Sequence, residues 1–256
     1  MLFVLGAAVG AYGTIIGAGG GFVLMPLLLF LYPTEAVPAL TSLSLSVVAL
    51  NAASGTAAYA RKRRIDYRLA LSVAAFSVPG SMIGAVVTPY VPRSTFELSF
   101  GLLLLALAAV IIARPPGGRR RTPDPTEVLA PAVYGHWRIG MALSAMLGCL
   151  AGLLGIGGAP PQVVVLTHVM QVPVWRAMPT VQFIVLLTVV GAVATHVVGG
   201  EFRAGLVPLL SLGVGALCGA QAGAAVSERL SGASLIRLLA VALVLAGAAL
   251  VLKSLR

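Results

Sequence analysis

The sequence predicts an all-α integral membrane protein with about eight transmembrane helices, arranged as two homologous four-helix repeats, each with a glycine-broken first helix. Three observations predict this fold class. Hydrophobic residues make up 59% of the 256-residue chain, charged residues only 9%, and the mean hydropathy is +1.03, so polar surface is too scarce to enclose a water-soluble core. Long apolar runs alternate with short charged loops. The two halves also share sequence landmarks in the same order.

The apolar runs without Asp, Glu, Lys or Arg give the expected spans. Most are close to the length of about 20 residues that a helix needs to cross the hydrocarbon. No Lys or Arg precedes the first run, and the run continues past any plausible cleavage site, so we expect a first span rather than a signal peptide. The runs cover 2–34, 36–60, 69–92, 98–113, 139–175, 177–200, 204–227 and 238–252.

Basic residues predict the orientation of the chain in a bacterial inner membrane. Two stretches, "RKRRIDYR" at 61–68 and "RPPGGRRRTPDPTE" at 114–127, carry most of the positive charge, and an even number of spans separates them. Both stretches are therefore expected in the cytoplasm, and eight spans then place both termini there as well. The formal net charge of +10 is explained by topology and by lipid headgroups of the bilayer, so we expect no nucleic acid partner.

The proline-rich stretch 114–135 is the expected cytoplasmic linker between a first repeat, 1–113, and a second repeat, 136–256. The segments "GTIIGAGGGFVLMP", "TSLSLSVV" and "PGSMIGA" of the first half match "AGLLGIGGAPPQVVVL", "PTVQFIVLL" and "VGALCGA" of the second after a shift of about 135 to 138 residues. A duplicated unit of four spans keeps its orientation. We therefore expect the halves to be related by an axis along the membrane normal.

The glycine clusters predict interruptions of the first helix of each half. Consecutive glycines free backbone groups that hydrocarbon cannot satisfy, so such a break persists only where protein or water covers it. A short second helix is expected to resume near Phe22 and near Pro160, with free N–H groups directed into the protein. Paired interruptions at matching repeat positions indicate the substrate site of a transporter. The alternative is close helix packing, which is expected for Gly80/Gly84 and Gly215/Gly219/Gly223.

The residues around the interruptions predict a site for a small anion. No basic residue lies well inside a span, so an anion at mid-depth would be held by helix N-termini, backbone N–H groups and neutral side chains. The lack of a deep carboxylate argues against a bare cation. For each polar side chain a purely structural role is the alternative. The expected substrate-binding residues are Gly17, Gly19, Gly20, Gly21, Phe22, Ser42, Asn51, Gly155, Gly157, Gly158, Gln162, Thr180 and Gln182.

Two histidines in apolar runs, His168 and His196, are candidates for a proton relay, with a structural bond near a span end as the alternative. The carboxylates are scattered at span ends, and Cys149 and Cys218 have no metal-like or redox spacing. We therefore predict no enzyme, no metal and no cofactor. A channel and a purely structural subunit are the competing classes, and a homo-oligomer is left open.

These segments carry a resemblance. The stretch "GAGGGFVLMPLL", the Ser- and Thr-bearing helix after it, the basic loop that follows and a weaker copy in the second half resemble the TauE/SafE sulfite exporter family, also called the toluene sulfonate uptake permease family. The resemblance implies a secondary transporter of sulfite or an organosulfonate such as sulfoacetate, which we expect to be an exporter working by alternating access between the repeats. An anion channel, or an importer of a related small anion, is the alternative. The resemblance supports Gly17, Gly19, Gly20, Gly21, Pro26, Gly155, Gly157 and Gly158, whereas Ala159 stands where a further glycine is usual.

Overall fold

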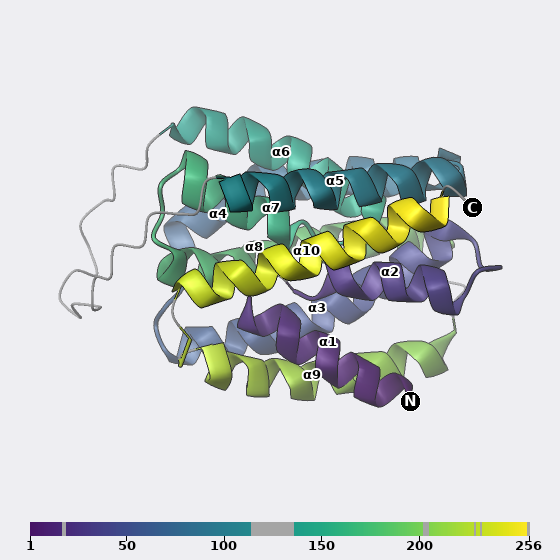
Figure 1. Cartoon of the computed structure of the whole chain (residues 1–256), viewed down its shortest axis with the longest axis horizontal. Helices are drawn as coiled ribbons and strands as arrows, with labels where there is room; N and C mark the ends of the chain where they lie inside the picture. The colour runs from purple at the N-terminus through teal and green to yellow at the C-terminus, as the bar shows by residue number, and fades with distance from the viewer. Residues whose placement is uncertain (17–18, 114–135, 202–204, 228, 231, 255–256) are drawn as a thin grey trace.

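A computed structural model describes residues 1–16, 19–113, 136–201, 205–227, 229–230 and 232–254, and every regular element in these ranges is helical (Figure 1). Seven of the described helices are long and apolar enough to cross a membrane, which confirms a multi-pass, all-α membrane protein. The elements are α1 (Leu2–Ile15), α2 (Gly21–Leu31), α3 (Val37–Arg61), α4 (Tyr67–Val87), the 3-10 turn η1 (Thr88–Tyr90), α5 (Arg93–Ala113), α6 (Trp137–Leu154), α7 (Ala159–Val164), the π-helical segment η2 (Val165–Val169), α8 (Val174–Val198), α9 (Leu206–Ser227) and α10 (Gly232–Ser254).

Helices α3 and α8 form an antiparallel pair at the middle of the bundle. The Ser42 hydroxyl, near the start of α3, donates to the carbonyl of Glu201, just after α8, at 3.4 Å. The Thr180 hydroxyl, near the start of α8, accepts a hydrogen bond from the backbone amide of Asp66, just after α3, at 3.1 Å. The start of each helix thus lies beside the end of the other.

The remaining helices follow one or the other member of this pair. Helices α4 and α6 run parallel, because Gly80 faces the Ala145 carbonyl and Gly84 faces the Cys149 carbonyl one turn further on. A hydrogen bond of 2.9 Å between Ser77 of α4 and Thr188 of α8 adds α8 to this parallel group. Helices α1, α3 and α9 run in the opposite direction. Their contacts are Gly6 with Leu212, Gly10 with Ala216, Ser54 with Leu217 and Tyr59 with Ser227.

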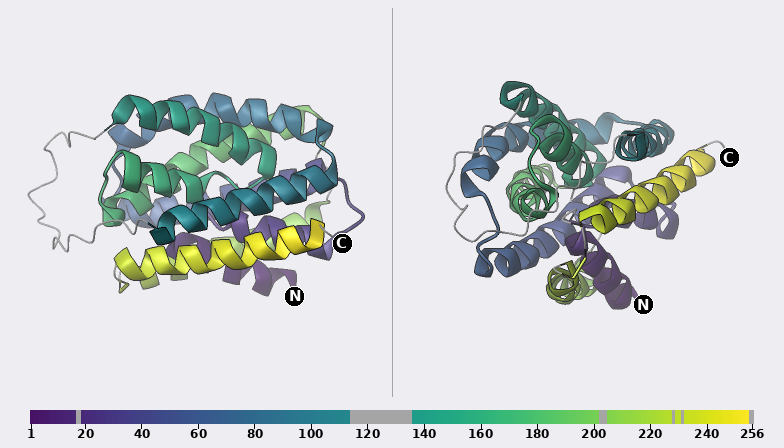
Figure 2. Two further views of the ribbon diagram at one scale, coloured as in Figure 1. Left: turned by 45° about the horizontal axis from the view of Figure 1, so that its top comes forward. Right: turned by 60° about the vertical axis from the view of Figure 1, so that its left-hand side comes forward.

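These directions show that the chain turns back twice inside the bundle. Helices α1 and α3 start at the same end, so α1 and α2 together return to the end where α1 began (Figures 1 and 2). Helices α6 and α8 start together at the other end, so α7 and η2 likewise return, and Met170 after η2 packs on Gly140 near the start of α6. The predicted first and fifth spans are therefore wrong as single crossings.

The predicted parallel relation of the two halves is wrong for the same reason. When its first segment turns back, each half crosses the membrane with an odd number of helices, so the second half runs through the bundle in the opposite direction to the first. An axis in the membrane plane relates such halves. The duplication itself, with bounds 1–113 and 136–256, stays a prediction, and the linker 114–135 lies outside the described residues.

The large helix contacts join one half of the chain to the other. Helix α1 packs on α9, α4 on α6 and α8, α3 on α8 and α9, and α5 on α10. Exchanging α1, α3, α4 and α5 for α6, α8, α9 and α10, in that order, reproduces the same set of contacts: α1–α9 exchanges with α4–α6 and α4–α8 with α3–α9, while α3–α8 and α5–α10 map onto themselves. Glycines allow the closest of these approaches: a Cβ on Gly80, Gly84, Gly215, Gly219 or Gly223 would collide with a backbone carbonyl of the facing helix.

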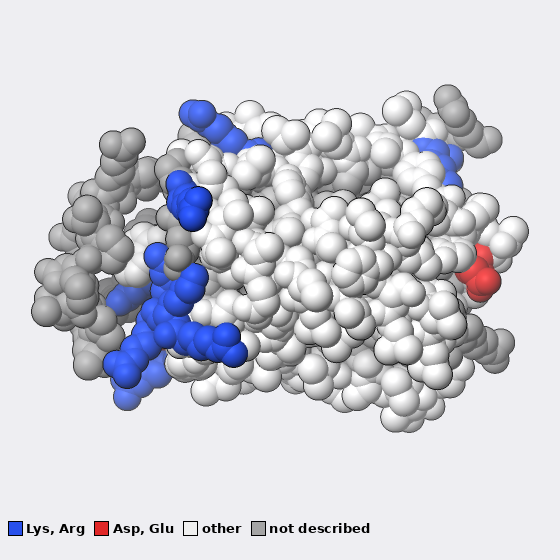
Figure 3. Space-filling model, turned by 90° about the horizontal axis from the view of Figure 1, so that it is seen from below, with Lys and Arg blue, Asp and Glu red and all other residues white. Residues whose placement is uncertain are grey.

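Charge is distributed unevenly between the two ends of the bundle (Figure 3). The end at which α3 finishes and α4, α6 and α8 begin is called the basic end, and the opposite end, which holds Glu35 and both described termini, the far end. Among the described Lys and Arg residues, only Arg93 and Lys253 lie at the far end. Those at the basic end are Arg61, Lys62, Arg63, Arg64, Arg68, Arg138, Arg176, Arg229 and Arg237.

Candidate functional site

The chain leaves the helix at both glycine clusters. Helix α1 finishes at Ile15 and α2 starts at Gly21, while α6 finishes at Leu154 and α7 starts at Ala159. The residues that cap the two new helices, Gly20 and Gly158, have φ angles of +78° and +75°, a region that side-chain-bearing residues adopt at a cost of about 1–2 kcal/mol. Gly17 lies outside the described residues.

The two glycine segments approach each other in the protein interior. A Cβ on Gly21 would lie 2.6 Å from the carbonyl oxygen of Ile156, so only glycine permits this contact. Gly19 and Gly157 both lie against the side chains of Val48 on α3 and Val185 on α8. The segments therefore meet on either side of a valine pair in the middle of the α3–α8 interface.

Helical spacing turns this interface into a continuous buried strip. On α8, positions separated by three, four and seven residues share one face, and the antiparallel α3 presents a matching face. We call these two faces the central seam. From the far end to the basic end its members are Thr41, Ser44, Val48, Gly55 and Tyr59 on α3, and His196, Val189, Val185 and Gln182 on α8; all except the glycine have buried side chains.

Asn51 holds the first glycine segment in place. Its side-chain N–H group donates to the Gly19 carbonyl at 2.9 Å, and its oxygen accepts from the Thr14 hydroxyl at 3.1 Å. The Tyr59 hydroxyl donates to the Thr14 carbonyl at 2.9 Å, which fixes the end of α1. Asn51 is thus a positioning residue whose amide is already used by the protein.

The start of α2 places its first-turn amides beside Val48 of the valine pair. The amides of Val23 and Leu24 bond to the Gly20 carbonyl at 3.1 and 2.9 Å. The amides of Gly21 and Phe22 have no carbonyl partner within the helix, as is usual for a first turn, and both residues are buried. The positive end of the α2 dipole therefore lies in the interior, close to Gly157 and Ile156.

Gln182 is a buried amide whose oxygen and nitrogen both lack a hydrogen-bond partner. Its nitrogen lies 2.6 Å from where a Cβ on Gly55 would be, and the Thr14 methyl group lies against the same position. Because α3 and α8 are antiparallel, Asn51 and Gln182 both lie about one turn from the valine pair toward the basic end. Each unsatisfied group costs about 1–3 kcal/mol unless a bound molecule, water or an anion, supplies the partner.

The second glycine segment is built differently. The Ser44 hydroxyl donates to the Gly155 carbonyl at 2.8 Å, and α7 begins with Ala159, Pro160 and Pro161. Two of these first three positions carry no N–H group, so α7 presents fewer free donors than α2. After six residues α7 passes into the π-helical turn η2, a geometry that often occurs at functional sites.

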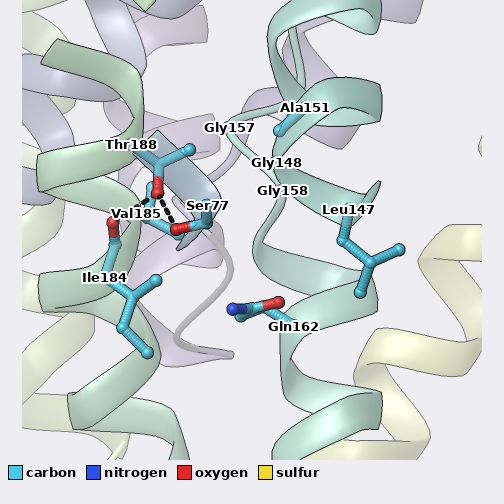
Figure 4. A pocket seen from close by; sticks show the side chains of 10 residues that line it. All are labelled: Ser77, Leu147, Gly148, Ala151, Gly157, Gly158, Gln162, Ile184, Val185 and Thr188. Atoms are coloured by element: carbon cyan, nitrogen blue, oxygen red, sulfur yellow. Dashed lines mark hydrogen bonds between the residues drawn. The ribbon is translucent and has the colours of Figure 1, made fainter. Parts of the chain in front are cut away.

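A small cavity lies beside the second segment (Figure 4). Its volume is about 10 Å³, close to the room that one water molecule needs. Gln162 lines it, with its nitrogen bonded to Ser144 at 3.1 Å and its oxygen without a partner. The paired hydroxyls of Ser77 and Thr188 complete the polar lining. The sequence did not indicate Ser77 or Thr188 as site residues, because each is a single polar residue in an apolar run. They come together only when α4 and α8 pack.

The other predicted residues are distributed over both ends of the molecule. Ser42 and Thr180 lie at opposite ends of the α3–α8 pair, and neither reaches the glycine segments. His168 lies in η2, where its ring contacts the Thr167 hydroxyl at 2.9 Å. His196 is buried at the far end and contacts Glu201. In the part of the chain that the structure describes, no group of His, Cys, Asp and Glu is arranged to hold a metal ion.

Comparison with known proteins decides the family. The family model described as sulfite exporter TauE/SafE matches residues 2–250. The chain belongs to the TauE/SafE family. It is similar to the probable membrane transporter proteins YunE and YdhB of Bacillus subtilis (strain 168), with 29% identity over 98% of this chain and 96% of YunE, and 27% identity over 88% of this chain and 86% of YdhB.

A third TauE/SafE-type relative, the probable membrane transporter protein MJ0441 of Methanocaldococcus jannaschii, is 25% identical over 77% of this chain and 71% of its own length. No solved structure matches the chain significantly. Family membership and the apolar helices together identify the chain as a membrane transporter.

Proposed function

We propose that this TauE/SafE transporter is a secondary transporter that exports a small sulfur-containing anion, sulfite or an organosulfonate such as sulfoacetate, across the bacterial inner membrane. The observation that carries the proposal is the meeting of the two glycine segments at the central seam, where α2 begins beside Val48 and where Gln182, about one turn from the valine pair, has an unsatisfied amide. The family description supports sulfur as the central element of the anion.

Backbone and neutral side chains hold the anion in this proposal. Its oxygens accept hydrogen bonds from the Gly21 and Phe22 amides and from the Gln182 nitrogen, and the α2 dipole favours its charge. No described Lys or Arg is buried in the bundle, so no permanent cation traps the anion. Such a site binds strongly enough to select an anion and weakly enough to release it.

Alternating access is proposed to separate the central seam. Close glycine contacts bind α1 to α9 and α4 to α6, so the bodies that move are α1–α3 with α9, and α6–α8 with α4, rather than the two sequence halves. Helices α5 and α10 pack on each other and connect the bodies. The cavity beside the second segment, about 10 Å³, has no room for sulfite, so the seam has to open before an anion enters it.

We propose the orientation in which the basic end faces the cytoplasm, since positive charge is retained on that side. Both termini then lie outside, contrary to the expectation from eight crossings. An outward-moving single negative charge gains about 2.3 kcal/mol from a potential of about 100 mV, inside negative, which favours export.

Cysteine labelling tests this orientation. In a background without Cys149 and Cys218, Arg61→Cys at the basic end is expected to react with an impermeant maleimide only from the cytoplasmic side. Glu35→Cys at the far end is expected to react only from outside. Labelling of Arg61→Cys only from outside, or of Glu35→Cys only from the cytoplasmic side, would contradict this orientation.

Binding to the purified protein tests the function. Titration with sulfite, sulfoacetate, taurine, thiosulfate and sulfate is expected to show saturable binding of at least one of the sulfur anions, followed by saturable uptake into proteoliposomes. Electrical currents that do not saturate with anion concentration would favour a channel instead. Failure of all five compounds to bind would overturn the proposal.

A further inference from the structure

We propose that His196 and Glu201 form a proton-binding site at the far end of the central seam, and that this site couples proton movement to anion transport. The inference rests on the proposed function, because a coupling site has meaning only in a transporter that moves an anion through the seam. Nothing in the family description or in the names of the relatives assigns such a site.

The geometry of the pair is that of a buried imidazole with one charged partner. His196 lies in the last turn of α8 and is 1% exposed, and its Nδ1 atom lies 2.5 Å from the Glu201 carboxylate. Its Nε2 atom is buried without a hydrogen-bond partner. The Glu201 side chain is 19% exposed, so the pair is connected to solvent on the carboxylate side only.

This arrangement has two protonation states that differ in charge. A contact this short between a ring nitrogen and a carboxyl oxygen requires one proton between the two atoms, and when Nδ1 carries that proton it donates to Glu201. With Nε2 unprotonated, the pair carries one negative charge. One proton taken up at Nε2 makes an imidazolium and brings the pair to neutrality, without breaking any bond. Histidine is the side chain that changes charge near neutral pH.

The described groups next to the pair on α3, α4 and α6 are neutral. From α3, the Ser42 hydroxyl donates to the Glu201 carbonyl, and Thr41 beside it is buried with a hydroxyl that has no hydrogen-bond partner. The last turns of α4 and α6 carry no charged residue. Glu97 at the same end belongs to another cluster, in which Arg93 and Lys253 each lie 2.9 Å from it on α5 and α10. No further described charged residue forms an ion pair with His196 or Glu201.

The pair is connected to the anion site along one helix face. His196 lies seven residues after Val189 and eleven after Val185, the valines that flank the glycine segments, so all three point into the central seam. An unprotonated pair repels an anion that moves along this face toward the far end, and a protonated pair does not. The anion leaves toward the far end when the proton is bound, and the proton is released toward the basic end when the seam next opens there, so one proton moves in the direction opposite to the anion.

The described seam residues at the basic end, Gly55, Tyr59 and Gln182, include no histidine and no carboxylate. Tyr59 occupies the corresponding place on α3, and its hydroxyl bonds the Thr14 carbonyl at 2.9 Å and the Ser227 hydroxyl at 3.0 Å. A tyrosine does not change charge near neutral pH. The two ends of the seam therefore respond differently to pH, and the proton is taken up from the far-end side.

Transport by His196→Gln and Glu201→Gln in proteoliposomes tests the inference, with sulfoacetate as the probe because both of its anionic groups stay ionised between pH 6 and 8 (about two or more units above their pKa values). Each variant is expected to lose sulfoacetate accumulation driven by a pH gradient by about tenfold or more, because the charge switch is gone. Exchange of labelled sulfoacetate at equal pH on both sides is expected to continue in Glu201→Gln, whose site is permanently neutral, and to fall in His196→Gln, in which Glu201 keeps its negative charge.

His168→Gln is the matched control, since His168 lies in η2 and outside the seam; its pH-driven accumulation is expected to equal that of the wild type. Unchanged pH-driven accumulation in both His196→Gln and Glu201→Gln would overturn the coupling site and leave the proposed function standing. Wild-type protein that neither binds nor exchanges sulfoacetate would instead contradict the proposed function for this anion. Loss of exchange in both variants along with accumulation would show a structural role and would also overturn the coupling site.

Discussion

The two glycine segments occupy equivalent places in the bundle but present different chemistry. Both begin a new helix at a glycine with a positive φ angle, and both lie against Val48 and Val185. The first continues as α2, whose eleven residues start with two uncapped amides, whereas the second continues as α7, whose six residues start with a Pro160–Pro161 pair.

This difference shows that the halves do not contribute equally to the site. The first segment provides the first-turn amides of α2 and is fixed by Asn51, and Gln182 lies about one turn from the valine pair that this segment contacts. The second segment provides close contact, a cavity of about 10 Å³ and the π-helical turn η2. We therefore expect the first segment to hold the anion and the second to shape the space around it.

The largest effect is expected from changing the glycine caps. Gly20→Ala introduces strain and places a Cβ 2.8 Å from the Val9 carbonyl, which redirects the free amides of α2. Anion affinity, measured by titration of the purified protein, is expected to fall by about 100-fold because those donors are lost. Gly158→Ala carries similar strain but is expected to change affinity by less than about threefold.

Gly200→Ala provides the control for strain alone, because Gly200 has a φ angle of +70° and no atom within 4 Å of its added Cβ. Its affinity is expected to match the wild type. Equal losses of affinity in Gly20→Ala and Gly158→Ala would break the distinction between the segments.

Gln182→Leu is expected to have the next largest effect. The change removes a proposed ligand and lowers anion affinity by about tenfold, but it also removes two unsatisfied buried groups, so the thermal stability of the anion-free protein is expected to stay equal or to rise. Thermal unfolding in detergent with and without sulfite measures both quantities. A less stable variant with unchanged sulfite affinity would assign Gln182 a structural role.

The smallest effect is expected from the side chains that position the segments. Asn51→Ala removes two hydrogen bonds from the first segment and is expected to lower unfolding stability by about 2–3 kcal/mol. Ser44→Ala removes one bond from the second segment and is expected to cost about 1 kcal/mol. Chemical denaturation followed by tryptophan fluorescence measures the difference. A larger loss of stability in Ser44→Ala than in Asn51→Ala would show that the second segment is held more strongly than the first.

Local sequence was sufficient for the features that depend on composition. Apolar runs identified the helices, and glycine clusters marked the two places where the chain leaves the helix. Gln182 was recognisable because a buried amide is costly wherever it lies in an apolar run. Each of these signals is contained in one segment and needs no knowledge of its neighbours.

The direction of each helix through the bundle and the partners of its polar side chains depended on contacts between segments that are distant in the sequence. Hydropathy does not distinguish an apolar run that crosses the membrane from one that turns back inside it, so 2–34 and 139–175 were each counted as one span. For that reason the two halves were predicted to be parallel, whereas they run in opposite directions. Glu201 was recognised only as a carboxylate at a span end, because its histidine partner is brought to it by the turn after α8. Ser42 and Thr180 looked equivalent in sequence, and antiparallel packing placed them at opposite ends.

The position of a bound anion tests the central claim most directly. Diffraction from crystals grown with selenite, the selenium analogue of sulfite, locates the anion by its anomalous signal. We predict one selenium site at the central seam, within hydrogen-bond distance of the Gly21 and Phe22 amides and of Gln182. Selenium found only beside Arg93 and Lys253 or among the arginines of the basic end would contradict an anion site built without ionised side chains.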